Sequence, residues 1–533
     1  MSHLGYCFST TGSGRPYARN ARYYGVSDNA CVVLDGTRVV YAGETERFTK
    51  VKHDPLKYPE ILRLFKTISN LAKNAEFTYI NGDDAPNNHH ENHMYEVFYQ
   101  SGFSESAVLV NDGNGNFGEC ITLAYIQEGN NPVILKKFDM PASPASIYGL
   151  FADKIFKEPF AEGKLMGLAA YGHDNSSKYI SWNGSSSEIE IATDEEIAEE
   201  IQNYMKDSND VMLARDIAYT VQKNYEETMV NVVKYFKKLL ESRDFQTENL
   251  CMSGGGILNC PANSKIVGTG LFKNFYASPQ PHDGCAESIG RAFRNMEYRG
   301  MKLKSKRLEA PFLGIAYPAS ELLNPHSYLD NWQADILRSL LKGNIIAWCQ
   351  DGAEYGPRAL GHRSFLADPT KKEMADALNR IKGREPWRPL APIVPDRLFP
   401  LIFDVENTDM CEYMLRTLTI KEKWQPKLQA ICHVDGTTRP QLLKRDMNSQ
   451  LYDILMAYFQ QTGVPCLVNT SLNINGFPIV ETPYDFGCLI DEIGLANGAT
   501  EAADEKSNQP EVVGIFVEGE DFYKVERLET ICE

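Results

Sequence analysis

Four short apolar runs in this chain lead directly into polar or glycine-rich turns. Residues 107–111 are followed by Asp112, residues 250–252 lead into three glycines, and residues 345–348 and 464–468 lead into further polar turns. In α/β folds, ligand chemistry lies at the C-terminal ends of strands, where carboxylates and glycine turns face the ligand. The pattern therefore predicts an α/β protein with sites at several strand ends.

The length of the chain, 533 residues, is too great for one hydrophobic core, so two or three domains are expected. A proline-rich stretch covers residues 311–325, and we place the boundary between Gly314 and Pro325. The predicted domains are residues 1–318 and 326–533.

The composition excludes some classes of protein. No run of 18 apolar residues occurs, so no membrane partner is expected. No export signal is visible at the N-terminus, which predicts a cytoplasmic location and 12 reduced cysteines. The net charge of −17 disfavours a general nucleic-acid coat, because phosphate binding needs clustered cations, but it leaves room for a local basic patch.

Three of the ten histidines fall within residues 89–93. In a helix, His89 and His93 would project from one face about one turn apart and could hold one metal ion. Asp112, at a strand end, and Asp283, after a later apolar stretch, are further candidate ligands. Two histidines and two aspartates suit Fe(II), Mn or Zn. The alternative, a polar turn with surface histidines, stays open.

The glycine turn at residues 254–256 precedes a predicted helix from residue 257 to about residue 267. Such a turn can present backbone N–H groups to a phosphate, although three glycines also occur in plain turns. Two asparagines four residues apart on this helix could contact a ribose or a base. The predicted nucleotide-binding residues are Lys164, Gly254, Gly255, Gly256, Asn259 and Asn263.

In the second domain, cations stand among rigid glycine and proline residues. They are Arg358, Arg363, Lys382, Arg384 and Arg388. Guanidinium forks suit phosphate or carboxylate groups, whereas a solvated basic surface is the alternative.

Two other polar segments are candidate parts of a site. The run at residues 464–468 delivers Asn469 and Ser471 at a strand end. Residues 44–54 form a dense charged cluster in which Lys52 and His53 could meet an anionic ligand. A solvated helix start explains that cluster equally well.

Eight motifs occur in a fixed order along the chain. They are HHENH, Asp112-Gly113, EGKLMGLAAYG, SGGGILNCPAN, EYGPRALGHRS, KGREPWRPLAP, HVDGTTRPQ and NTSLNINGFPIV. Together they resemble the O-carbamoyltransferases related to nodulation protein U and to the enzymes that act on tobramycin and cephalosporins. The resemblance covers nearly the whole chain, and the ordered set is far more specific than any one motif.

The resemblance implies an actin-like ATPase domain followed by a YrdC-like domain. It implies that carbamoyl phosphate and ATP form carbamoyl-adenylate and pyrophosphate in the second domain, with Mg for ATP. The carbamoyl group then passes to an acceptor hydroxyl at a metal-bearing site in the first domain. By resemblance, His89, His93, Asp112 and Asp283 bind iron. The residues predicted to bind carbamoyl phosphate or the nucleotide are Arg358, Arg363, Lys382, Arg388, Asn469 and Ser471.

The chain departs from the family pattern at two places. A His-Asp pair that family members carry is Ser27-Asp28 here, and His53 could substitute for the missing histidine. Asp28, Lys52 and His53 are therefore the predicted catalytic residues. The segment at residues 283–290 is one residue longer than in relatives, so the fourth metal ligand is either Asp283 or Glu287.

The acceptor is predicted from an additional loop at residues 11–24, where arginines alternate with tyrosines. This composition suits stacking on bases and pairing with phosphates. Some viral relatives are thought to carbamoylate hydroxymethyl-pyrimidines, so hydroxymethylcytosine in DNA or a nucleotide is the expected acceptor. A sugar or antibiotic hydroxyl competes with it, a nucleotide sensor or scaffold is the non-enzyme alternative, and a homodimer stays open. The predicted acceptor-binding residues are Arg15, Tyr17, Arg19 and Arg22.

Overall fold

The computed structural model describes residues 4–9, 30–35, 38–44, 46–50, 75–78, 88–115, 118–182, 184, 189–206, 208–298, 300–499 and 510–528. The chain divides into two compact units. The first comprises Met1–Thr45, His53–Leu308 and Leu415–Thr417. The second comprises Glu46–Lys52, Glu309–Met414 and Leu418–Glu533.

The main division lies after Leu308, a few residues before the predicted boundary. Backbone hydrogen bonds explain its position. Leu308 N–H donates to the carbonyl of Gln100 at 3.0 Å, which ties it to the first unit. Gly314 N–H donates to the carbonyl of Ala353 at 2.9 Å, so the proline-rich stretch already belongs to the second unit.

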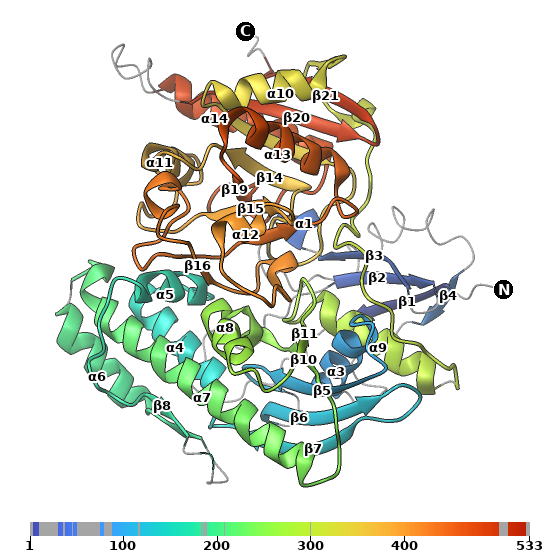
Figure 1. The fold of residues 1–533 in the computed structure, drawn as a ribbon, viewed down its shortest axis with the longest axis vertical. Coiled ribbons are helices and arrows are strands. Elements are labelled where there is room, and N and C mark those ends of the chain that lie inside the picture. Colours follow the sequence, from blue (N-terminus) through green and yellow to red (C-terminus); the bar gives the residue numbers. More distant parts are fainter. Residues whose placement is uncertain are drawn as a thin grey trace. The chain divides into compact units, whose positions relative to one another are not determined.

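The first unit contains two sheets of related topology (Figure 1). In one, the strand order is β3-β2-β1-β4, with β1, β2 and β3 antiparallel and β4 parallel to β1. In the other, the order is β11-β10-β5-β6-β7, with β5, β6 and β7 antiparallel and β10 and β11 parallel to β5. The strands are β1 Leu4–Ser9, β2 Ala30–Asp35, β3 Arg38–Glu44, β4 Ala75–Thr78, β5 Glu105–Asn111, β6 Glu119–Gln127, β7 Val133–Asp139, β10 Asn249–Ser253 and β11 Asn274–Tyr276.

This repeated order, an antiparallel meander extended by parallel strands, is the arrangement of the predicted actin-like domain. The predicted α/β class is thus confirmed. Strands β2 and β3 form a hairpin, because they pair antiparallel with Asp35 opposite Arg38.

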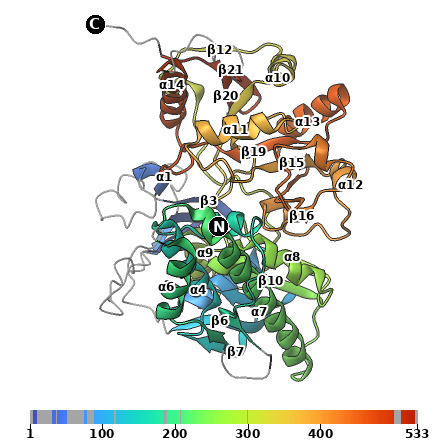
Figure 2. The same cartoon turned by 90° about the vertical axis from the view of Figure 1, so that its left-hand side faces the viewer.

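Helices of the first unit pack on these sheets. Helix α3 packs against α9 (Figure 1), and α4 packs against α6 and α7 (Figure 2). Between residues 188 and 243 the chain forms two helices, α6 and α7. The helices are α3 His89–Tyr99, α4 Pro144–Phe156, α5 Glu162–Ala169, α6 Asp194–Met205, α7 Arg215–Glu241, α8 Cys260–Gly268 and α9 Cys285–Tyr298, with short turns η1 Val211–Ala214 and η2 Gly255–Leu258 and a small hairpin β8 Ile180–Ser181 and β9 Glu190–Ile191.

Helix α3 begins as predicted and enters a core. Its N-cap is Asn88, whose side-chain oxygen accepts the Glu91 N–H at 3.4 Å. Val97 and Phe98 are fully buried, as is Phe293 on α9. The polar start of α3 therefore lies at the end of a buried helix, which is how a helix can project side chains into a site.

The second unit is built on one mixed sheet of eight strands, in the order β12-β21-β20-β13-β14-β19-β15-β18. Neighbours are antiparallel except β13 with β20 and β15 with β18. The strands are β12 His326–Tyr328, β13 Ile345–Gln350, β14 Arg363–Ala367, β15 Ala391–Pro395, β18 Gln441–Leu443, β19 Leu467–Ser471, β20 Val512–Glu518 and β21 Asp521–Val525, with a separate pair β16 Leu418–Thr419 and β17 Thr437–Thr438.

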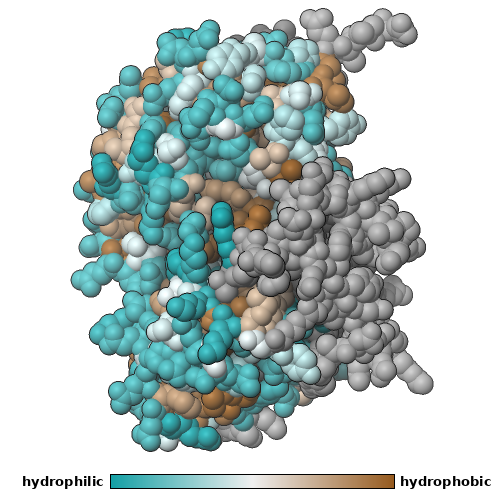
Figure 3. All heavy atoms as spheres, turned by 90° about the vertical axis from the view of Figure 1, so that its right-hand side faces the viewer, coloured by the Kyte–Doolittle hydropathy of each residue, from teal (hydrophilic) through white to brown (hydrophobic). Residues whose placement is uncertain are grey.

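One hydrophobic core runs through the second unit and includes Phe365, Val468, Phe486 and Phe516. The helices around it include α1, which comes from an early part of the sequence. They are α1 Glu46–Thr49, α10 Trp332–Leu341, α11 Lys372–Ile381, α12 Phe399–Ile402, α13 Ser449–Thr462 and α14 Pro483–Ala499, with turns η3 Ala319–Glu321, η4 Cys411–Tyr413 and η5 Gln425–Lys427. On the face that Figure 3 shows, most described side chains are hydrophilic and the hydrophobic ones lie in scattered groups.

Candidate functional site

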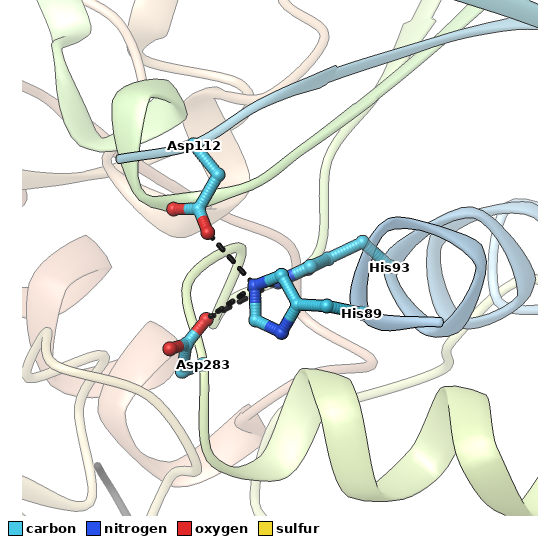
Figure 4. Close-up of side chains that lie close together, drawn as sticks. All are labelled: His89, His93, Asp112 and Asp283. Carbon is cyan, nitrogen blue, oxygen red and sulfur yellow. Dashed lines mark hydrogen bonds and ion pairs between the residues drawn. The ribbon is translucent and has the colours of Figure 1, made fainter. Parts of the chain in front are cut away.

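Four side chains from three parts of the first unit converge on one point (Figure 4). His89 and His93 project from the first turns of α3, as their spacing predicts. Asp112 follows β5, and Asp283 lies in the loop before α9. One potential ligand atom from each side chain lies within 4.8 Å of all the others.

The geometry of this cluster joins imidazole nitrogens to carboxylate oxygens. His89 Nε2 lies 2.8 Å from Asp112 Oδ2 and 3.2 Å from Asp283 Oδ1. His93 Nε2 lies 3.3 Å from the same Asp283 oxygen. Both Nε2 atoms therefore face the two carboxylates across a small polar centre, and Asp283 contacts both histidines.

Three of the four ligand candidates have a second contact on the side away from the cluster. His93 Nδ1 lies 2.9 Å from Ser253 Oγ, and His89 Nδ1 lies 3.7 Å from Glu287 Oε1. The backbone N–H of Gly255 donates to Asp112 Oδ1 at 2.9 Å. Contacts of this kind fix the tautomer and orientation of metal-binding histidines.

The charges of the cluster stabilise one another. Burial opposes the charged form of His89, but the charge of Asp283 and hydrogen bonds to the surrounding carboxylates raise its pKa well above the usual value. Burial likewise disfavours ionised Asp283, yet the two histidines hold the pKa of this carboxyl well below its usual range. Imidazolium and carboxylate thus compensate each other, a role that a bound cation would take over.

The donor set fits a divalent transition metal. Two imidazoles and two carboxylates match the borderline character of Fe(II), Mn or Zn. His90, the third histidine of the segment, does not join the set: its Nδ1 lies 2.7 Å from Thr122 Oγ1, and burial lowers its pKa to about 3. Metal binding by the four residues stays a prediction, now with convergent geometry.

The glycine turn after β10 packs on the end of β5. Gly254 has a φ of 94°, and its N–H donates to the carbonyl of Pro281 at 2.6 Å. A Cβ on Gly256 would lie 2.4 Å from Asn111 Nδ2, so only glycine permits this approach. The turn presents Gly255 N–H to Asp112, which makes it part of the metal cluster's support.

The other predicted nucleotide-binding side chains have protein partners. Asn259 caps α8 and exchanges hydrogen bonds with Gln222 at 2.8 and 3.1 Å. Asn263 Nδ2 donates to the carbonyls of Ile257 and Leu415. Lys164 pairs with Glu158 at 2.7 Å. Nucleotide binding by these residues and the glycines stays a prediction.

A cluster of arginines forms in the second unit. Burial lowers the pKa of the Arg384 guanidinium to about 9. The positive charges of Arg388, Arg439 and Arg358 act in the same direction, and Glu385 opposes them. Such a concentration of like charge is unfavourable by itself and favourable around an anion. Arg439 had no assigned role in the sequence prediction.

Two predicted anion-binding cations are occupied by backbone oxygens. Arg363 is buried, and its guanidinium donates to the carbonyls of Gln350, His362, Asp351 and Glu481. Lys382 is fully buried, and its ammonium contacts the carbonyls and side-chain oxygens of Ser471 and Asn473. Both hold strand ends and loops together, and their contact with a ligand stays a prediction.

Asn469, on β19, is buried, and hydrogen bonds among the described residues satisfy only one end of its side-chain amide. Its Nδ2 donates to the carbonyl of Ala359 at 3.0 Å and to Gln441 Oε1 at 2.7 Å. Within the described part of the chain, its Oδ1 has no hydrogen-bond donor. A buried acceptor of this kind suits a ligand N–H group.

The remaining predicted residues lie outside the described residues. They are Asp28, Lys52, His53, Arg15, Tyr17, Arg19 and Arg22. The structure adds two supporting residues without a role in the sequence prediction, Ser253 behind His93 and Arg439 in the arginine cluster. For Ser253, the one local signal of its supporting role is its position at a strand end before glycines.

The comparisons with known proteins cover both units. The family model described as Carbamoyltransferase N-terminus matches residues 66–293, and Carbamoyltransferase C-terminus matches residues 337–495. Nodulation protein NolO of Bradyrhizobium diazoefficiens is 31% identical over 422 residues, which are 75% of each chain. The chain belongs to the carbamoyltransferase family. It is therefore an enzyme that transfers carbamoyl groups.

Other relatives of this carbamoyltransferase match over shorter stretches or at lower identity. Nodulation protein U of Rhizobium tropici is 36% identical over 247 residues, 45% of this chain and 41% of that protein. Among solved structures, full-length HypF in its phosphate- and nucleotide-bound form matches with a TM-score of 0.35 at 11% identity, over 56% of each chain. Across the described residues of the carbamoyltransferase, no helix is both long and apolar enough to cross a membrane.

Proposed function

We propose that this carbamoyltransferase is an ATP-dependent O-carbamoyltransferase with a different reaction step in each unit. In the second unit, carbamoyl phosphate and ATP form carbamoyl-adenylate. In the first unit, the carbamoyl group passes to an acceptor hydroxyl. The observation that carries the proposal is the pair of unlike sites, an arginine cluster around Arg384 and a His/Asp cluster around His89.

The first step suits the arginine cluster because carbamoyl phosphate, ATP, carbamate and the released phosphates are all anions. Water cleaves carbamoyl phosphate to carbamate and orthophosphate. A carbamate oxygen then attacks the α-phosphorus of ATP, the bond to the β-phosphate breaks, and pyrophosphate leaves. Four guanidiniums, from Arg358, Arg384, Arg388 and Arg439, would stabilise the charge on the reacting phosphates.

Asn469 supports a carbamoyl group as the ligand. Its buried Oδ1 has no donor among the described residues, and the carbamoyl amide carries N–H donors. A carboxylate or phosphate ligand could not satisfy this oxygen. Arg363 and Lys382 are occupied by protein oxygens, so we assign them to holding the strand ends instead of contacting phosphate.

The second step suits the His/Asp cluster. His89, His93, Asp112 and Asp283 would hold a divalent metal ion, which when bound polarises a carbonyl or binds phosphate oxygens. Fe(II) fits the donor set, as do Mn and Zn. Ser253, Glu287 and Gly255 keep His93, His89 and Asp112 in place, in that order. The acceptor oxygen attacks the carbamoyl carbon, and AMP leaves.

We propose a hydroxymethyl group on a pyrimidine, in DNA or in a nucleotide, as the first acceptor to test. The support is the alternation of arginine with tyrosine at residues 15–24, outside the described residues. A sugar hydroxyl is the competing acceptor.

The decisive experiment measures two products. The full chain, with ATP and carbamoyl phosphate, should release pyrophosphate only when both substrates are present. Mass spectrometry across a panel of hydroxyl acceptors, including DNA with hydroxymethylcytosine, should then detect the gain of one carbamoyl group. Binding of ATP without pyrophosphate release would instead indicate a sensor or scaffold.

A further inference from the structure

Helix α1 belongs to the second unit although its residues stand early in the sequence. The chain leaves the first unit after Thr45 and rejoins it at His53, and Glu46–Lys52 lies in the second unit. Arg47, on this segment, has only 3% of its side chain exposed. The burial of Arg47 in the second unit indicates that this arginine has a role there.

The guanidinium of Arg47 donates hydrogen bonds to the loop that carries Arg358. Its Nη1 donates to the carbonyl of Glu354 at 2.6 Å, and its Nη2 donates to the carbonyl of Gly356 at 2.7 Å. Gly356 has a φ of 100°, a conformation that other residues rarely adopt. The two hydrogen bonds of the Arg47 guanidinium thus fix the backbone two residues before Arg358.

The Glu354 carboxylate accepts hydrogen bonds from backbone N–H groups at the other end of the same loop. Glu354 is fully buried, and its Oε1 accepts the N–H of Leu360 at 2.5 Å and those of His362 and Arg363 at 3.4 Å. Arg358 lies within this closed loop, between Glu354 and the three donors. Its backbone position therefore depends on both sets of hydrogen bonds.

A third contact ties α1 to the start of α14. The Lys50 ammonium donates to Asp485 Oδ2 and to the carbonyl of Arg47. Asp485 also accepts the N–H of Thr482 at 2.9 Å. Arg47 itself lies 3.8 Å from the Glu481 carboxylate. The described part of this segment, residues 46–50, is therefore anchored on two elements of the second unit.

We propose that Arg47 is a positioning residue for the arginine cluster, holding the Glu354–Gly356 backbone and through it the Arg358 that follows. The inference rests on the proposed anion chemistry of that cluster. Converging guanidiniums repel one another, so a loose loop would let Arg358 turn away and weaken binding. A lysine cannot replace the fork, because a single ammonium does not match two carbonyls in fixed geometry.

The test uses Arg47→Lys in the full chain, with Arg338→Lys as the matched control. Arg338 has 65% of its side chain exposed and pairs only locally with Asp335. Pyrophosphate release gives KM and kcat for carbamoyl phosphate and ATP, and calorimetry gives the Kd of pyrophosphate. We expect Arg47→Lys to raise KM and Kd about ten-fold, with kcat changed less. The control should match wild type.

The outcomes separate the two proposals. If wild-type protein neither releases nor binds pyrophosphate, the proposed function fails. If wild type does both and folded Arg47→Lys shows wild-type KM and Kd, the positioning role is overturned.

If Arg47→Lys does not fold, Lys50→Met decides, because the Lys50 side chain is 34% exposed and its loss is milder. A smaller rise in KM and Kd supports the role, and wild-type values overturn it.

Discussion

The two candidate sites hold charge in opposite ways. In the first unit, His89 and His93 face Asp112 and Asp283, so positive and negative groups compensate each other. In the second unit, Arg384 shares its surroundings with other arginines, and burial and these charges together lower its pKa to about 9. Opposite charges attract one another, whereas like charges repel and must be held together by a rigid backbone or by a ligand.

This difference gives each site its own dependence. The His/Asp cluster depends on its ligands and on the hydrogen bonds behind them. The arginine cluster depends on the loop around Arg358 and on the anchors of that loop, Arg47 and Glu354. Changes at one site should therefore leave the chemistry of the other intact.

The largest expected effect is on metal binding. His93→Ala removes one of four converging ligands, so we expect metal content and carbamoyl transfer to fall by about 100-fold or more. Pyrophosphate release should continue, because we propose that this step takes place in the second unit. Elemental analysis and product assays measure both, with His173→Ala as the control because its side chain is 90% exposed. If carbamoyl transfer and pyrophosphate release fall equally, the two sites do not act independently.

The reverse change should spare the metal. Arg388→Ala removes one guanidinium from the anion site, so we expect pyrophosphate release to fall about 100-fold, the usual cost of losing one donor to a developing charge. Metal content should match wild type. Arg338→Ala is the control for the loss of a surface arginine. A variant that loses metal as well would show that the two sites are not independent.

The third prediction sharpens the identity of the fourth ligand. Asp283 Oδ1 lies within 3.3 Å of both Nε2 atoms, whereas Glu287 lies 3.7 Å from the opposite nitrogen of His89. Glu287→Gln should therefore weaken metal affinity about ten-fold, as loss of a supporting carboxylate does. Asp283→Asn should weaken it further. If titration of the metal gives the reverse order, Glu287 is the ligand.

The smallest effect concerns Glu96, a fully buried carboxyl on α3 whose Oε1 accepts a hydrogen bond from Gln100. Burial raises the pKa of Glu96 from 4.5 to about 8. The folded state keeps a proton that the unfolded state releases, so this contribution is fully present below pH 4.5 and is lost as pH rises through 8. Between these two pH values the slope is about 1.4 kcal/mol per pH unit.

Glu96→Gln should remove this slope, because its amide stays neutral. Denaturant unfolding at several pH values, with exposed Glu199→Gln as the control, measures the difference. If the slope of the stability curve is the same in Glu96→Gln as in wild type, Glu96 is not a buried neutral acid.

Much of the first site could be predicted from the sequence. The spacing of His89 and His93 identified one helix face, and the turn after residues 107–111 placed Asp112 at a strand end. The choice between Asp283 and Glu287 could not be predicted. It depends on where the loop before α9 meets α3, and the two segments lie nearly 200 residues apart.

Less of the second site followed from its residues. Arg363 and Lys382 stand in the same cationic segments as Arg358 and Arg388, yet the first two are occupied by buried oxygens. Whether a cation meets a carbonyl or faces outward depends on the packing of strands and loops from distant parts of the chain. Composition and spacing carry no information on that packing.

By itself, the sequence determined the α/β class, the histidine pair and the family, because local periodicity, strand-end turns and ordered motifs are written in neighbouring residues. The tertiary structure decided which acid converges with His89, His93 and Asp112 and which cations lie near Arg384. It also joined Arg47 to the loop that carries Arg358. Those outcomes depend on contacts between residues far apart in the sequence, such as the 309 positions between Arg47 and Gly356, where geometry alone decides which partner is met.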